Sequence, residues 1–218
     1  MSAQVITVAS LKGGSGKSTL ASCLAVYWRM RGRRVLLVDA DPQHSVLRLA
    51  AREQALDGLP VIARADRDMW KAVKEQASDY DLIVVDTPGF DSEITAAGLA
   101  VADLVLIPVK PSPLDVDRMT DTVGLLMAGV QGWAPTFRCV LTQTTRGSVI
   151  ARHIRAELEE AGFPLLRQEL QNRVSYAEAA LYGATPTLTQ PDGAAAQDVQ
   201  ELAGEVEALL ATRKVRSA

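Results

Sequence analysis

The sequence has few of the features that mark membrane, secreted or disulfide-rich proteins. No apolar run approaches the length needed to cross a bilayer, and no signal-peptide pattern precedes the first apolar segment. The 218 residues include only two cysteines, Cys23 and Cys139, which lie far apart and form no C-x-x-C pair. We therefore expect no disulfide framework and no cysteine metal site, and we expect a cytoplasmic protein.

An excess of charge of one sign is also missing. The net charge is −3, with 22% charged and 48% hydrophobic residues, a composition typical of a soluble globular protein. Nothing in this overall balance indicates nucleic-acid binding. The length suits one domain over residues 1–218 with a substantial core.

A glycine-rich segment near the start carries the strongest signal. The apolar run 5–9 predicts a buried strand before it, and residues 20–30 predict a helix after it. Glycines let backbone N–H groups close on an anion, and a helix N-terminus adds its positive dipole end. In such a phosphate loop Lys17 would neutralise the β- and γ-phosphates of a nucleotide, and the Ser18 hydroxyl would ligate Mg²⁺.

Apolar, strand-like segments alternate with helical patterns along the rest of the chain. This alternation predicts an α/β fold with a doubly wound, mostly parallel sheet and helices on both faces. The expected strands are 5–9, 35–38, 61–63, 82–85, 104–109, 137–141 and, last and short, 165–166. The expected helices are 20–30 (beginning near residue 17), 43–54, 66 or 67 to 78, 92–101, 113–128, 148–161, 174–181 and 194–211, with a loop over 183–193.

Acidic residues follow two of the expected strands directly. Asp39 and Asp41 come after strand 35–38, and Asp86 comes after strand 82–85. In open α/β sheets ligands bind beyond the carboxyl ends of the strands, where these carboxylates would meet the phosphate loop. Asp86 would support Mg²⁺ near the Ser18 hydroxyl, through water. Aspartate at a strand end is also common as a helix cap or turn former.

The loop departs from the standard G-x-x-x-x-G-K-[ST] pattern, because its first glycine is replaced by Leu11 and followed by a second lysine, Lys12. The segment from Lys12 to Ser18 resembles the deviant Walker A motif of the ParA/MinD family of dimerising ATPases. The resemblance implies a P-loop NTPase in which Lys12 reaches the nucleotide of a second subunit. It also implies an ATP-binding set made up of Lys12, Gly13, Gly14, Ser15, Gly16, Lys17, Ser18 and Thr19.

Further segments extend the resemblance over nearly the whole chain. D-x-D-P-Q at residues 39–43 resembles the second motif of the family. This resemblance implies that Asp41 orients the attacking water and that Asp39 has a supporting role. Residues 107–115 and 173–179 resemble the small ParF-like plasmid-partition ATPases. In the family, the adenine lies near Thr142 and Gln143 and near the loop after Leu166. The sequence lacks an N-K-x-D motif, which disfavours GTP.

The family resemblance implies a Mg²⁺-dependent ATPase that forms an ATP-bound homodimer on non-specific DNA. A ParB- or ParG-like adaptor on the cargo would stimulate hydrolysis, and the dimer would be nucleoid-associated. DNA binding needs a basic surface. Five arginines are candidates, with Arg173 favoured by the resemblance: Arg146, Arg152, Arg155, Arg167 and Arg173. Glutamates that follow on the same helix make a solvated surface equally consistent for Arg152 and Arg155.

Two other functions remain open at this point. A biosynthetic amide-forming ATPase of the dethiobiotin or cobyrinate synthase type would share the phosphate loop but show no DNA stimulation. A MinD-like membrane-cycling ATPase would need a basic amphipathic C-terminal helix. The expected helix 194–211 instead carries Glu201, Glu205 and Glu207 among its leucines, so we expect it to pack on the body of the protein and expect no membrane partner.

Overall fold

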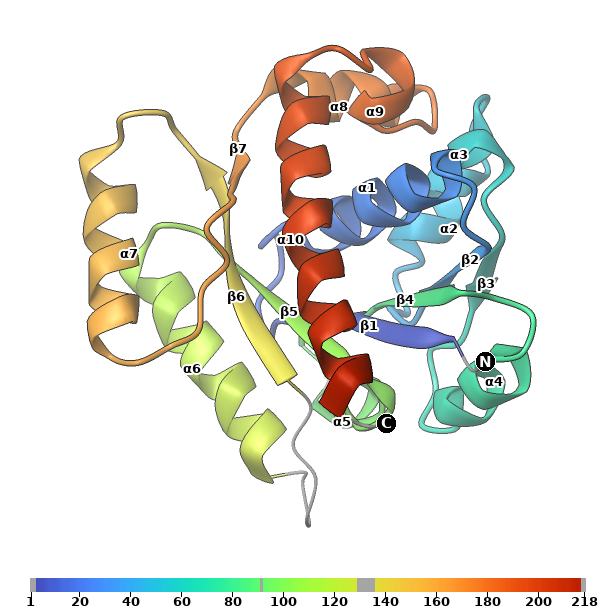
Figure 1. Ribbon diagram of the computed structural model, residues 1–218, viewed down its shortest axis with the longest axis horizontal. Coiled ribbons are helices and arrows are strands. Elements are labelled where there is room, and N and C mark those ends of the chain that lie inside the picture. Colours follow the sequence, from blue (N-terminus) through green and yellow to red (C-terminus); the bar gives the residue numbers. More distant parts are fainter. Residues whose placement is uncertain (1–2, 91, 129–135, 217–218) are drawn as a thin grey trace.

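The computed structural model describes residues 3–90, 92–128 and 136–216, and in these a seven-stranded sheet lies between two layers of helices (Figure 1). The strands are β1 (Gln4–Val8), β2 (Val35–Asp39), β3 (Val61–Ala63), β4 (Leu82–Asp86), β5 (Leu104–Val109), β6 (Thr136–Thr144) and β7 (Leu170–Gln171). The helices are α1 (Lys17–Met30), α2 (Ser45–Ala50), α3 (Ala55–Gly58), α4 (Met69–Gln76), α5 (Ser92–Val101), α6 (Pro113–Ala128), α7 (Val149–Glu160), α8 (Val174–Leu181), α9 (Pro186–Thr189) and α10 (Ala194–Arg216).

The sheet is parallel throughout, in the order β3-β2-β4-β1-β5-β6-β7, which confirms the predicted doubly wound α/β fold. Strands β2, β4 and β5 are buried along their whole length. Such strands read as continuous runs of valine, isoleucine and leucine because helices cover both faces. Since all strands point the same way, their carboxyl ends meet at one edge of the sheet.

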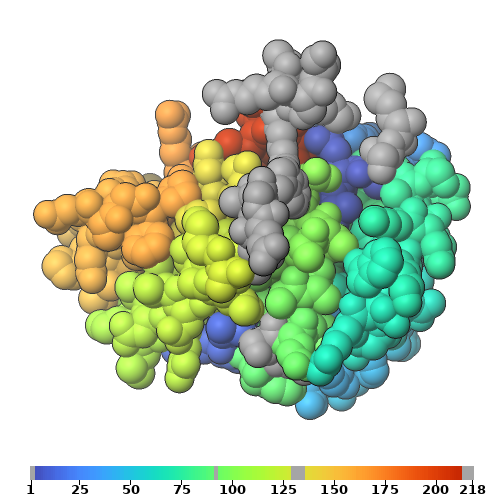
Figure 2. Space-filling view, turned by 90° about the horizontal axis from the view of Figure 1, so that it is seen from below, coloured from blue at the N-terminus to red at the C-terminus, as the bar shows by residue number. Residues whose placement is uncertain are grey.

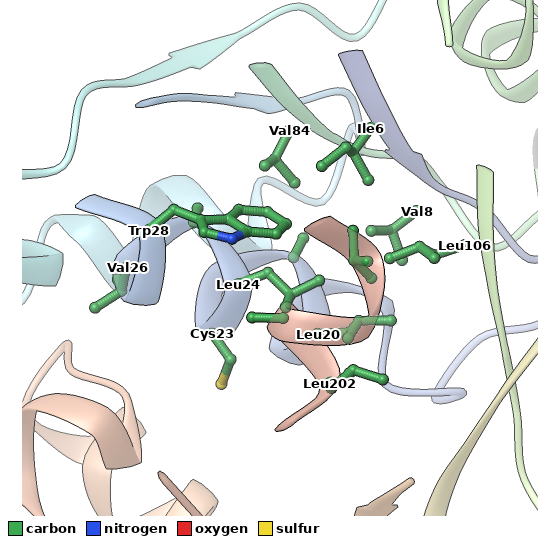
Figure 3. Packing of buried hydrophobic residues seen from close by; sticks show 14 of the residues in the cluster. Ile6, Val8, Leu20, Cys23, Leu24, Val26, Trp28, Val84, Leu106 and Leu202 are labelled. Atoms are coloured by element: carbon green, nitrogen blue, oxygen red, sulfur yellow. The ribbon is translucent and has the colours of Figure 1, made fainter. Parts of the chain in front are cut away.

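Each face of the sheet packs against its own set of helices. On one face, α1 lies between the sheet and α10, with Leu20, Leu24 and Trp28 packed among sheet side chains and Leu202 (Figure 3). On the other face α5 and α6 lie side by side, with α4 and α7 beyond them (Figure 2). Within the described ranges, no helix is both long and apolar enough to span a bilayer.

Several predicted element boundaries were wrong. The helix predicted over 43–54 is interrupted: His44 adopts a left-handed φ of 51°, α2 begins only at Ser45, and α3 is a separate turn. The strand predicted at 165–166 is only a single bridge from Leu165 to Cys139, while the short strand β7 follows it. The loop predicted over 183–193 contains the short helix α9.

A seam of hydrogen bonds joins the α2–α3 segment to the end of α8. The backbone N–H groups of Gln54 and Leu56 donate to the carbonyl oxygens of Tyr182 and Gly183, both at 2.8 Å. Gly183 has φ +73°, and a Cβ there would lie 2.7 Å from the Leu49 carbonyl oxygen. The close approach therefore requires glycine at this position.

Candidate active site

The glycine-rich loop joins the carboxyl end of β1 to the first turn of α1, where the helix leaves backbone N–H groups without intrahelical partners. Gly14 and Gly16 hold φ values of +74° and +91°, left-handed conformations that favour glycine. The Lys17 side chain turns back across the loop, and its Nζ donates to the Lys12 carbonyl oxygen at 2.9 Å. The loop therefore has the shape and charge of an anion cradle.

The end of β6 holds the loop in place from the side. The Thr142 hydroxyl donates to the Ser15 carbonyl oxygen at 2.8 Å, and Gln143 Nε2 donates to the Gly14 carbonyl oxygen at 3.1 Å. Gln143 does so from a left-handed backbone conformation, φ 53°, which is uncommon for a non-glycine residue. These bonds occupy loop carbonyls and leave the loop N–H groups for a ligand.

Asp86 ends β4 beside the loop and is completely buried. Neither carboxylate oxygen has a well-formed hydrogen bond among the described residues, and the Ser18 hydroxyl and Lys17 ammonium are its favourable neighbours. Burial raises the pKa of Asp86 to about 7, and the negative charges of Asp39 and Asp41 add to the increase. Burial also lowers the pKa of Lys17, against the effect of Asp86.

A buried carboxylate next to a hydroxyl fits a Mg²⁺ site, because this hard cation prefers oxygen ligands and keeps several waters. The part of the chain that the structure describes contains no group of three or more His, Cys, Asp or Glu side chains able to hold a metal. A cation at Ser18 and Asp86 would therefore need phosphate oxygens and water to complete its coordination.

The aspartates after β2 have different surroundings. Asp39 is buried, and its two oxygens accept from the backbone N–H groups of Asp41, at 3.1 Å, and Leu47, at 2.9 Å. Asp39 thus fixes the loop that leads to α2. Asp41 is half-buried and accepts from the Gln43 backbone N–H at 2.8 Å. Asp41 lines the same cavity as the loop residues Lys17 and Ser18, where a phosphate ligand would lie.

Two cavities that share lining residues flank the loop. The first, of about 440 Å³, lies between the loop and the segments after β2 and β4; Asp41, Lys17 and Ser18 are among its lining residues. The second, of about 290 Å³, lies between the loop and α8, with Tyr176 and Arg173 in its wall. The residues common to both are Gly16, Thr19 and Gln143. The size and position of the two cavities fit the phosphates of a nucleotide in the first cavity and its nucleoside in the second.

Lys12 forms an ion pair within its own chain. Its Nζ lies 2.5 Å from Oδ2 of Asp115 in the first turn of α6, and the Ser112 hydroxyl donates to the same oxygen at 2.6 Å. Asp115 is only 5% exposed, whereas the Lys12 side chain is 32% exposed. In the single subunit Lys12 is therefore directed to α6.

The structure does not bring the five predicted DNA-binding arginines together as one free surface. Arg173 is held by Asp198 on α10 through two hydrogen bonds, at 2.7 and 3.0 Å, and Arg155 pairs with Glu169 at 2.7 Å. Both are partly buried. The other three of the five arginines form no ion pair among the described residues: Arg146, Arg152 and Arg167.

Two contacts of the loop were not predicted from the sequence. They are the ion pair of Lys12 with Asp115 and the hydrogen bond from Gln143 to Gly14. Asp115 lies 103 positions from Lys12 in the chain, so no local spacing could reveal their contact. The only sequence signal for Asp115 was its position at the start of a helix that follows a buried strand. That location predicts the same sheet edge but names no partner.

A strand, a glycine-rich anion cradle, a helix and two acidic strand ends define a P-loop nucleotide-binding protein. Residues 6–186 match the family model of the CobQ/CobB/MinD/ParA nucleotide-binding domain, and the chain belongs to this family. This confirms the resemblance to the ParA/MinD family.

Two relatives align with almost the whole chain. The maintenance of carboxysome distribution protein A of Halothiobacillus neapolitanus is 31% identical over 207 residues, covering 92% of this chain and 95% of its own. The chromosome-partitioning ATPase Soj of Thermus thermophilus is 28% identical over 238 residues, covering 93% and 95%. The septum site-determining protein MinD of Pyrococcus horikoshii, solved with Mg-ADP, shares the fold with a TM-score of 0.75 at 23% identity, covering 95% and 97%.

Proposed function

We propose that this chain is an ATP-driven positioning protein of the ParA type. Two ATP-bound subunits form a sandwich that binds DNA without sequence preference, and an adaptor on the cargo triggers hydrolysis and release. The observation that carries the proposal is the phosphate cradle with its second lysine, Lys12, together with the buried Asp86 carboxylate. Relatives named for chromosome partitioning and carboxysome distribution support the kind of task.

Each group at the cavity has a part in the proposed reaction. The loop N–H groups and Lys17 bind the β- and γ-phosphates, while Ser18 and Asp86 would hold Mg²⁺, which neutralises phosphate charge when bound. Asp41 orients a water for attack on the γ-phosphorus; the bond to the β,γ-bridging oxygen breaks, and ADP and inorganic phosphate result. Asp39 keeps the Asp41 loop in place through its two backbone hydrogen bonds.

The packing of α10 helps to decide whether the proposed ATP-bound dimer binds to DNA or to a membrane. Its apolar residues Val199, Leu202 and Val206 are fully buried against α1 and the sheet. A membrane-bound helix needs such a face for the lipid boundary, and here the protein itself covers it. We therefore propose DNA as the surface on which the ATP-bound dimer resides, in the cytoplasm at the nucleoid.

The test compares wild type with Asp41→Ala on a DNA-coated surface in Mg-ATP, beside a phosphate-release assay. Losing a water-orienting group lowers the hydrolysis rate by about 10²–10⁴-fold and leaves nucleotide binding largely intact. Asp41→Ala should therefore bind ATP, stay on DNA and wash off far more slowly than wild type. Asp192→Ala, at an exposed aspartate away from the cavity, is the control and should behave as wild type.

Two outcomes would contradict the proposal. Wild-type hydrolysis by Asp41→Ala would remove its catalytic assignment. Absence of DNA binding by wild type with a non-hydrolysable ATP analogue at low salt would remove the positioning function, and turnover only with a carboxylic acid substrate would indicate a biosynthetic amide-forming ATPase. Proposed binding to DNA should also weaken steeply with salt, as counterion release requires.

A further inference from the structure

A third lysine, Lys110, lies beside the phosphate loop. Lys110 directly follows β5 and is half-buried; its Nζ lies 3.9 Å from where a Cβ on Gly14 would be. Across the residues that the structure describes, no hydrogen bond or ion pair engages this ammonium group. A positively charged group thus lies next to the loop, and no ion pair among the described residues neutralises it.

Asp115, close by, has a carboxylate oxygen that could accept a further hydrogen bond. Its Oδ2 accepts from both Lys12 and the Ser112 hydroxyl. Its Oδ1 is buried and accepts from no donor in the part of the chain that the structure describes. A carboxylate accepts at both oxygens when donors are present, so Asp115 can take a second cation.

Lys110 begins the short connection from β5 to α6, and Asp115 lies in the first turn of α6. The Ser112 N–H donates to the Lys110 carbonyl oxygen at 2.7 Å, and the Asp115 N–H donates to the Ser112 carbonyl oxygen at 3.0 Å. Both residues lie beside the same end of the phosphate loop, Lys110 at Gly14 and Asp115 at Lys12. An exchange of partners at Asp115 would require the Lys110 side chain to turn from Gly14 toward this carboxylate.

We propose that Lys110 is a positioning residue that takes the place of Lys12 on Asp115 when Lys12 leaves. The departure of Lys12 toward the nucleotide of a second subunit rests on the proposed function; the exchange itself does not. Removing one member of a buried ion pair leaves an uncompensated charge, which is strongly unfavourable. With Lys110 as the replacement, Asp115 stays paired and Lys12 is released at little cost.

The first experiment needs neither nucleotide nor dimer. Urea unfolding of the nucleotide-free protein is measured for Lys12→Met, Lys110→Met and the double variant, with Lys74→Met on α4 as an exposed lysine control. Each single variant keeps one cation for Asp115 and should change the unfolding constant by less than about threefold. The double variant should exceed the product of the single effects by about tenfold, the range of direct coupling.

The same cycle in an Asp115→Asn background identifies the acceptor. The coupling between the two lysines should disappear there, because the neutral amide needs no cation. Strictly additive single effects in the wild-type background would overturn the exchange. Coupling that persists with asparagine would also overturn it, since the lysines would then interact through some other group.

The second experiment measures dimerisation with a non-hydrolysable ATP analogue by sedimentation. Lys110→Met should weaken the dimer about tenfold, and should have no effect in the Asp115→Asn background. Equal loss in both backgrounds, or loss of ATP affinity by the Lys110→Met monomer in equilibrium dialysis, would overturn the exchange and assign Lys110 to the nucleotide or the partner subunit directly. If wild type stays monomeric, the proposed sandwich fails and the unfolding cycle alone decides the exchange.

Discussion

The buried carboxyl group of Asp86 should make the nucleotide-free protein less stable as the pH rises. The carboxyl group ionises near its ordinary value of 3.8 in the unfolded chain but near 7 in the folded protein, because burial raises its pKa. Between these values the folded protein binds more protons than the unfolded chain, so the free energy of unfolding falls with increasing pH. A difference of about three pH units, at about 1.4 kcal/mol each, amounts to about 4 kcal/mol by pH 8.

Asp86→Asn removes the charge and keeps the shape, so we predict that it stabilises the nucleotide-free protein in this pH range. Its advantage over wild type should be near zero at pH 4 and approach about 4 kcal/mol at pH 8. Burial also raises the pKa of Asp39. Because the charges of Asp39 and Asp86 repel each other, removing the Asp86 charge relieves this repulsion and acts in the same direction. The gain comes at the expense of function, because the variant loses the carboxylate that would hold Mg²⁺.

The assay is urea unfolding between pH 4 and 8, with a chelator and without nucleotide, with Asp192→Asn as an exposed control that should follow wild type. Mg-ADP should then stabilise wild type by mass action but not Asp86→Asn. A variant that is destabilised at pH 8, or whose difference from wild type is the same at every pH, would refute the reasoning.

Three further predictions concern the loop and its surroundings. Gly89→Ala places a Cβ 2.9 Å from the Gly13 backbone nitrogen, so it should cost about 1–3 kcal/mol in urea unfolding and lower ATP affinity in equilibrium dialysis; unchanged affinity would count against close packing of the two segments. Lys12→Ala should bind ATP but release phosphate about 10²–10³-fold more slowly, and a normal rate would remove its proposed role. Arg146→Glu should weaken DNA binding and lower its salt slope by about one with unchanged stability, whereas Arg173→Glu should also lower the melting temperature because it breaks the ion pair to α10.

The sequence was most informative where burial is uniform. Strands β2, β4 and β5 are enclosed on both faces, so their apolar runs predicted them almost to the residue. Strand β7 has only two residues at a sheet edge, too few to produce a pattern. The expected helix 43–54 was predicted too long because His44 has a left-handed conformation and because Gln54 bonds to the Tyr182 carbonyl at the end of α8, a tertiary contact that local propensity does not reveal.

The candidate site likewise has a part that the sequence predicts and a part that it does not. The loop motif located the anion cradle, since a short stretch of backbone forms it. The pairing of Lys12 with Asp115, or of Arg173 with Asp198 25 positions away, depends on which helix starts face each other in the folded sheet. A sequence pattern gives the residue types at those starts, while the partner of each charge emerges only from the tertiary arrangement.

The seam between the α2–α3 segment and the end of α8 makes these parts one unit of local unfolding. Helix α8 lines the cavity next to the loop, and the segment after Asp41 continues into α2. Opening α8 would break the bonds from Gln54 and Leu56 to the Tyr182 and Gly183 carbonyls, so amide protons on both sides would exchange together. Local opening at α8 would then also loosen the loop that carries Asp41, the residue proposed to orient the attacking water.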